Sequence, residues 1–460
     1  MLKDNESLKL IKGEISMSSK KSNKQYASIF QLDGRPAMKE AIPLAFQHVM
    51  AMIVGCVTPA IVVAGVAGLN TQDQVILIQA SLVISAIATF IQVFSIGGFF
   101  GSRLPVILGI SFAYLPSLTA IAAGYNMATI FGAQIVGGFC AIIFGLNVEK
   151  LRKFFPPLIT GTVVFTIGLS LYPTAINYIA GGVGSPNYGA WQNWLVGLLT
   201  MIIVLVLNHW GKGIVKLASL LIGLIIGYII SAFFGMISFS AVATAGYFQL
   251  PQPLHFGVEF EVSSIITISL LFIINSVQAI GDFTATTSGG LDRLPTDKEL
   301  KGGITGYGLL NILGALIGGM PTATYSQNVG IVATTKVVNR VVFGIASGII
   351  LVAGLVPKFS ALLTTIPYCV LGGAVIGVFA SITMTGMKLI ATQELNYRNT
   401  SIVGLAVAMG IGITLVPQSL ALFPAWVTTV FGKSPVVVAT IVAITLNLVL
   451  PGKEKEDSGH

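Results

Sequence analysis

Charged side chains are scarce in this sequence. Asp, Glu, Lys and Arg together make up 9% of the 460 residues, whereas soluble domains contain roughly 25%. A soluble protein of this length could not cover its surface with so few charges. The composition therefore excludes a cytosolic enzyme and an intrinsically disordered chain.

Disulfide patterns and catalytic motifs are missing as well. The three cysteines, Cys56, Cys140 and Cys369, all lie within apolar stretches and have no metal-ligand spacing, so we expect neither a disulfide framework nor a metal site. The sequence has no Walker A motif, no zincin motif and no nucleophile elbow. We therefore predict a protein that is not an enzyme, with no catalytic residue, no cofactor and no ATP-driven step.

Apolar residues dominate what is present. They make up 54% of the chain, and the mean hydropathy is +0.88, which is typical of polytopic helical membrane proteins. A membrane helix needs about 20 mostly apolar residues. We predict an all-α membrane protein with fourteen transmembrane spans and an interfacial or re-entrant piece at 418–432. The fourteen candidate spans are 40–66, 74–95, 105–121, 125–146, 155–176, 190–208, 214–236, 263–286, 303–319, 322–335, 339–357, 361–385, 399–417 and 434–450.

The basic residues follow a pattern of membrane topology. A net charge of +8 could suggest nucleic acid, but eight of the 25 Lys and Arg lie in residues 1–39 and most others lie between apolar stretches. With a cytoplasmic N-terminus, 23 of them fall on the cytoplasmic side, and only Lys358 and Lys433 fall outside. We therefore expect a lipid bilayer and no nucleic acid as partner. We place the chain in the cytoplasmic membrane with both termini in the cytoplasm.

Fourteen spans divide into two halves of seven, as inverted repeats require. The third span of each half is irregular, because each begins with a proline and a β-favouring stretch, at 104–112 and 320–328. We predict short β-strands there. Broken backbone at membrane depth must line a cavity, so these two spans indicate the binding site.

Few ionisable residues lie at membrane depth. Asp282 is the only acid clearly within a predicted span, and such residues are functional candidates by default. Gln278 lies four residues earlier, on the same helix face. His48 lies in the first span. Each of the two ionisable residues also has an interpretation without a functional role. Asp282 would then be a residue hydrated from the inside, and His48 would be a packing residue with a satisfied hydrogen bond.

The segment from Tyr325 to Gly330 is the most informative one. Ser326, Gln327 and Asn328 lie where a strand is expected to turn into a helix, so two carboxamides and freed backbone groups meet there. This chemistry suits a neutral or weakly acidic planar ligand with alternating N–H and C=O groups. The alternative is an ordinary capped helix start.

The ten residues from Gln327 to Lys336 resemble the signature of the nucleobase–ascorbate transporter family, Gln-Asn-x-Gly-x-x-x-x-Thr followed by Arg, Lys or Gly. The resemblance continues in Gln47-His48, in 109–114, and in Gly281-Asp282 with 284–286. It covers roughly residues 38–450.

The resemblance implies two inverted seven-span repeats divided between two domains. Spans 1–4 and 8–11 would form a core domain, and spans 5–7 and 12–14 a gate domain through which a homodimer forms. The corresponding ranges are a tail at 1–39, core segments at 40–146 and 263–357, gate segments at 147–237 and 358–450, and a tail at 451–460.

The resemblance also implies roles for the site residues. Gln327 would bind a base through its amide, Ser326 and Phe112 would add contacts, Tyr325 would flank the pocket, and Asn328 would support it. Gln278 stands where the family usually has Glu, and we count it among the substrate-binding residues. Because Asp282 is the only acid left within a predicted span, we predict that Asp282, with His48, carries a coupling proton, contributes to a cation site or supports the site structurally.

Members of the family carry purines, pyrimidines or ascorbate, typically by proton or sodium symport. Uracil carriers tend to have Glu in place of Gln327, so xanthine or uric acid is favoured here. The alternatives are a uracil or pyrimidine permease, a sulfate- or bicarbonate-type anion transporter of the same fold, and a channel or sensor.

Two departures from the family pattern leave the coupling ion open. Gln278 replaces the usual Glu of span 8, and Tyr307 stands where an Asp is common in span 9. Both changes remove an ionisable carboxyl.

Overall fold

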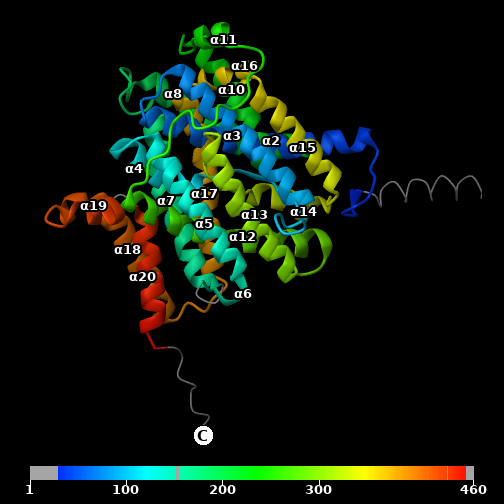
Figure 1. Ribbon diagram of the computed structural model, residues 1–460. Helices are drawn as coiled ribbons and strands as arrows, with labels where there is room; N and C mark the ends of the chain where they lie inside the picture. The colour runs from blue at the N-terminus through cyan, green and yellow to red at the C-terminus, as the bar shows by residue number, and fades with distance from the viewer. Residues whose placement is uncertain (1–28, 152–154, 433, 452–460) are drawn as a thin grey trace, which may run out of the picture.

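The computed structural model describes residues 29–151, 155–432 and 434–451, and these form an almost entirely helical molecule (Figure 1). The elements of the first half are α2 Met38–Val66, α3 Thr71–Phe94, β1 Leu108–Ile110, η1 Phe112–Tyr114, α4 Leu115–Gly124, α5 Met127–Leu146, α6 Val148–Leu151, α7 Pro157–Ile179, α8 Trp191–Trp210, α9 Ile214–Leu217, α10 Ser219–Phe233 and α11 Ser240–Thr244. Those of the second half are α12 Val262–Leu291, α13 Asp297–Leu316, β2 Thr322–Thr324, α14 Ser326–Thr335, α15 Arg340–Leu355, α16 Pro357–Thr364, α17 Tyr368–Ile390, α18 Tyr397–Leu415, η3 Pro417–Leu420, α19 Ala425–Gly432 and α20 Pro435–Val449.

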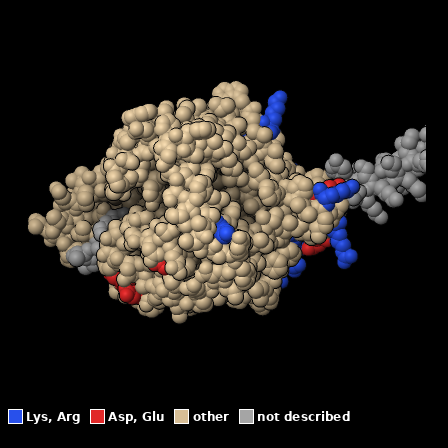
Figure 2. Space-filling model, turned by 90° about the horizontal axis from the view of Figure 1, so that it is seen from above, with Lys and Arg blue, Asp and Glu red and all other residues tan. Residues whose placement is uncertain are grey.

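The helices make this an integral, multi-pass membrane protein. Eight of the described helices are long and apolar enough to cross a bilayer, namely α2, α3, α5, α7, α8, α12, α17 and α18. The pair α15 and α16, bent by 78° at its break, forms a ninth candidate. Figure 2 shows one face of the molecule on which charged side chains are few and lie mostly toward its edges. The full count of fourteen spans stays a prediction.

Two short strands lie deep in the molecule and pair with each other. β1 runs antiparallel to β2, with Leu108 opposite Thr324, Gly109 opposite Ala323 and Ile110 opposite Thr322. Backbone groups at membrane depth cannot be hydrated and need partners within the protein. Each strand supplies these partners to the other. The main-chain groups of Leu108 also bond to the hydroxyl of Thr89 on α3, over 3.1 Å in both directions.

Helix starts are fixed by polar caps. The side chains of Asn70, Asn126, Glu261 and Asn396 each accept hydrogen bonds from the first-turn backbone of the helix that follows. At the start of α13, Thr296 forms a reciprocal capping box with Glu299. The box explains why this helix begins at residue 297, whereas the span predicted from hydropathy begins at 303.

Glycines allow the closest helix contacts. An added Cβ at Gly168 of α7 would lie 2.2 Å from the hydroxyl of Thr383 on α17, and one at Gly386 of α17 would lie 2.2 Å from the main-chain nitrogen of Phe165. The two helices therefore touch backbone to backbone, as small residues permit in membranes.

One more predicted boundary in the second half needs correction. The span predicted at 361–385 is wrong at its start, because residues 357–364 form the separate helix α16 and α17 begins only at Tyr368. Pro367 occupies the N-cap of α17, where the missing N–H of proline costs nothing. The predicted tails at 1–39 and 451–460 lie outside the described residues except for 29–39 and Pro451.

Candidate functional site

Asp282 lies at the junction of α12, β2 and α14. Its carboxylate accepts a hydrogen bond from the hydroxyl of Thr324 and another, of 2.8 Å, from the hydroxyl of Ser326. The side chain is buried. A buried carboxylate needs such donors, and here they come from the last residue of β2 and the first residue of α14. Asp282 thus fixes the strand-to-helix turn that carries Gln327.

Gln327 occupies the open side of this turn. Gln327 and Ser326 are exposed, and within the described residues the Gln327 carboxamide has no hydrogen-bond partner. Gly281 directly precedes Asp282, and Gly330 follows Gln327 by three residues; an added Cβ at either glycine would meet no heavy atom within 4 Å. The space in front of the signature turn is therefore free for a ligand.

Asn328 points to the opposite side. Its Nδ2 donates hydrogen bonds to Nδ1 of His48 over 3.1 Å and to the main-chain oxygen of His48 over 3.0 Å. The His48 ring packs against Phe343 with a centroid separation of 4.5 Å. Both polar residues are buried. This contact ties α14 to α2 and requires Nδ1 of His48 to be unprotonated.

Tyr325 is buried beneath the site. Its hydroxyl donates a hydrogen bond of 2.6 Å to the main-chain oxygen of Ile110 in β1. Its ring lies between two glycines, since an added Cβ would approach the ring to 3.1 Å from Gly55 and to 2.7 Å from Gly109. The hydroxyl of Tyr325 is thus engaged with the strand pair.

Phe112 begins η1 on the far side of the strand pair. Its ring meets the ring of Phe379 on α17 edge-on, with centroids 5.0 Å apart. Both rings are almost fully buried. This aromatic contact joins a broken span of the first half to a helix of the second half.

The two positions that depart from the family pattern differ in their surroundings. Gln278 is half-buried and has no hydrogen-bond partner among the described residues. It lies one helical turn from Asp282 on the same face. Tyr307 is buried, and its hydroxyl bonds to the hydroxyl of Tyr114, while both rings pack on Phe272 at centroid separations of 5.6 and 5.1 Å.

Sequence reasoning missed several contributors. Thr324 lies within the β-favouring stretch at 320–328, but nothing in the local sequence shows that its side chain faces Asp282. Phe379 is one apolar residue in an apolar helix, so no signal distinguishes it. The packing of the Tyr325 ring between Gly55 and Gly109 could not be predicted either, because both glycines lie far from Tyr325 in sequence. Within the described residues, no group of three or more His, Cys, Asp or Glu side chains is placed to hold a metal ion.

The chain is similar to known proteins over most of its length. Residues 39–419 match the model of a family described as a permease family. The chain is 34% identical to the xanthine permease of Bacillus subtilis, over 90% of this chain and 94% of the relative. It is 36% identical to the uric acid permease PucK of the same species, over 89% of this chain and 95% of the relative. The chain belongs to the nucleobase–ascorbate transporter family.

Family membership confirms the resemblance seen in the signature segment. It makes the protein a transporter and not an enzyme. Among solved structures, the transmembrane domain of the cyanobacterial bicarbonate transporter BicA superposes with a TM-score of 0.59 at 18% identity, over 87% of this chain and 96% of that one. That likeness shows a shared fold.

Proposed function

We propose that this family member carries a purine nucleobase across the membrane, with xanthine or uric acid as the favoured substrate. The observation that supports this most is the free carboxamide of Gln327, exposed beside Ser326 at a turn that Asp282 holds in place. The relatives named above are a xanthine permease and a uric acid permease.

The chemistry of an oxopurine fits the residues at this turn. Its edge presents N–H and C=O groups side by side, and a glutamine amide offers a matching acceptor and donor. The hydroxyl of Ser326 donates its hydrogen to Asp282, and its oxygen can still accept a hydrogen bond from the ligand. No observation favours a pyrimidine or an inorganic anion over a purine at this turn.

The transport cycle that we propose is movement of a core domain against a gate domain, in a protein of fourteen spans arranged as two inverted repeats. Two buried contacts join the proposed domains: the Phe112–Phe379 ring contact and a hydrogen bond of 3.0 Å between the hydroxyls of Ser117 and Ser434. Both would have to break when the core moves. We place the protein in the cell membrane, with cytoplasmic termini, as a homodimer through the gate domain.

Proton symport is the proposed mode of coupling. Asp282 contacts Thr324 and Ser326, which precede Gln327 in the turn, so its charge state and the geometry of the binding turn depend on each other. His48 reaches the same turn through Asn328. The two groups approach α14 from different helices and have no direct contact among the described hydrogen bonds.

Counterflow of radiolabelled xanthine in proteoliposomes tests the proposal. Competition by uric acid, guanine, hypoxanthine and uracil would rank the substrates. Replacing Gln327 by Ala removes one hydrogen-bonding partner from the bound base, at a cost of ~1–3 kcal/mol. Xanthine exchange should therefore fall by roughly 5- to 150-fold, while Gln393→Ala exchanges normally. Gln327→Glu should change which bases compete. If Gln327→Ala exchanges xanthine like the wild type, the assigned pocket is wrong. If the wild type exchanges no purine at all, the substrate assignment fails.

A further inference from the structure

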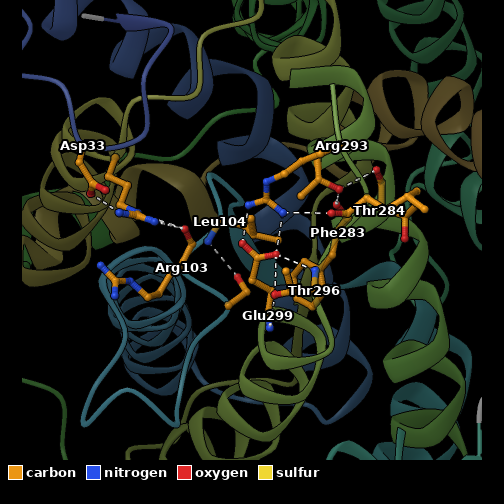
Figure 3. Close-up of polar contacts among 12 residues, drawn as sticks. Asp33, Arg103, Leu104, Phe283, Thr284, Arg293, Thr296 and Glu299 are labelled. Carbon is orange, nitrogen blue, oxygen red and sulfur yellow. Dashed lines mark hydrogen bonds and ion pairs between the residues drawn. The ribbon is translucent and has the colours of Figure 1, made fainter. Parts of the chain in front are cut away.

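A polar cavity of about 370 Å³ lies where several membrane helices end. The end of α12, the start of α13, the start of α15 and the connection from α3 to β1 all contribute to it, together with Leu32 and Asp33 of the N-terminal segment. Charged residues gather at such levels because the helices leave the hydrocarbon there. Figure 3 shows the polar contacts around this cavity.

Two of its basic residues are held by acids. Arg293 forms a two-fold hydrogen bond with Glu299, at 2.8 and 2.6 Å. Arg340 pairs with Asp33 and also donates to the main-chain oxygen of Arg103 over 3.0 and 2.8 Å. These pairs build the walls of the cavity, and their charges largely cancel.

Two further basic residues of the lining are not paired with an acid in the described part of the chain. The side chains of Arg103 and Lys298 are exposed, and neither has a partner among the residues that the structure describes. The main chain of Arg103 adopts a left-handed conformation, with φ of +60°, and its oxygen is held by Arg340. The lining as a whole contains four basic and two acidic residues, so it is positive by two charges.

An apolar surface belongs to the same connection that carries Arg103. Its exposed side chains are those of Phe94, Ile96 and Phe99, with exposed fractions of 38%, 56% and 76%. Two glycines of the same connection, Gly98 and Gly101, line the cavity. The connection at 94–104 therefore contributes both to the lining of the positive cavity and to an adjacent apolar strip.

We propose that this cavity binds the phosphate headgroup of an anionic phospholipid, with Arg103 and Lys298 contacting the phosphate and an acyl chain lying over Phe99. Guanidinium and ammonium groups are the usual partners of phosphate oxygens. Basic pockets between membrane helices at the bilayer surface bind such headgroups. A free phosphate would use the same charges but has no need of the apolar strip, which is why the lipid is favoured.

Native mass spectrometry of the purified full-length protein tests the site. The protein is exchanged into detergent with equal amounts of phosphatidylglycerol and phosphatidylcholine, and the retained lipid is counted. The wild type should retain phosphatidylglycerol preferentially, and Arg103→Gln with Lys298→Gln should lower that retention roughly thirtyfold, because two basic contacts at the membrane surface are lost together. Lys212→Gln with Lys216→Gln, which removes two charges between α8 and α10, is the matched control and should retain lipid normally.

Two further measurements separate the lipid from a soluble phosphate. Phe99→Ser should weaken retention of long-chain phosphatidylglycerol but leave binding of its short-chain dihexanoyl form unchanged. Titration with inorganic phosphate should give no binding that depends on Arg103 and Lys298. The proposal is overturned if the control pair loses as much lipid as the cavity pair, if Phe99→Ser has no effect on the long-chain lipid, or if phosphate alone binds and the lipid does not.

Discussion

The hydroxyl of Tyr325 donates a hydrogen bond of 2.6 Å to the main-chain oxygen of Ile110, 215 residues away in the chain. It therefore adds a side-chain bond to the strand pair that joins the two broken spans. Tyr325 therefore helps to hold β1 and β2 in register beneath the site, and Gln327 lies two residues after it in the chain.

Tyr325→Phe should lower stability and weaken substrate binding together. The change removes one buried hydrogen bond, worth about 1 kcal/mol, and leaves the ring between Gly55 and Gly109. We expect a Tm lower by a few degrees in detergent and a raised KM for xanthine. Tyr188→Phe removes an exposed hydroxyl that donates to Asn177 over 2.7 Å and serves as the control, with little change in either quantity. Equal effects of the two substitutions would contradict the role given to Tyr325.

Asp282→Asn should abolish concentrative uptake. An asparagine cannot accept hydrogen bonds on both sides from the hydroxyls of Thr324 and Ser326, and it cannot carry a proton. Uptake in energised vesicles, with and without a proton ionophore, measures the effect. Asp292→Asn is the matched control, because Asp292 ends the same helix and pairs with Lys336 at an exposed position. If Asp282→Asn still concentrates substrate and the ionophore still collapses the gradient, Asp282 is not the proton carrier.

Two glycines of α17, one turn apart, should respond differently to alanine. An added Cβ at Gly373 would lie 2.1 Å from the main-chain oxygen of Gly197 on α8, whereas at Gly377 it would meet nothing within 4 Å. Gly373→Ala should therefore push the two helices apart and cost roughly 1–3 kcal/mol, while Gly377→Ala leaves the Tm unchanged or raises it slightly. Thermal unfolding in detergent compares the pair. Similar Tm values for both variants would show that α8 and α17 can move apart without loss of stability.

The cap of α12 should make stability depend on pH. Partial burial opposes ionisation of Glu261, but hydrogen bonds from Ser263 and Ser264 outweigh it and lower the pKa of its carboxyl to about 2. A lowered native pKa stabilises the fold above the unfolded value of about 4.3, and the benefit disappears as the pH falls toward 2. The wild type should thus exceed Glu261→Gln in Tm at pH 7, and the difference should shrink between pH 4.5 and 2. A difference that stays constant over this range would assign the effect to packing.

Sequence alone located the signature turn, because Gln327 and Asn328 stand out among apolar neighbours, and it indicated the family. It could not show that these adjacent carboxamides face opposite ways, since that depends on where α2 places His48. Hydropathy also found the long helices. It misplaced the start of α17 and of α13, because their first residues are decided by Pro367 and by the Thr296–Glu299 box rather than by apolar content.

The partner of Phe112 was beyond the reach of sequence patterns for a different reason. Phe379 lies on a helix whose apolar residues all look alike, and only the packing of one half against the other singles it out. The same holds for the cavity at the helix ends. Its charged residues come from four separate stretches of chain, and each stretch alone resembles an ordinary loop.

The pairing of β1 with β2 has a consequence for synthesis of the chain. When the ribosome has just made β1, the main-chain groups of Leu108 to Ile110 still lack the strand that pairs with them, because β2 is more than two hundred residues from being translated. Unpaired backbone is costly in hydrocarbon. The first broken span must therefore wait at the insertion machinery or be shielded until residue 324 arrives. A nascent chain truncated before β2 should be degraded as misfolded, however well its long helices have inserted.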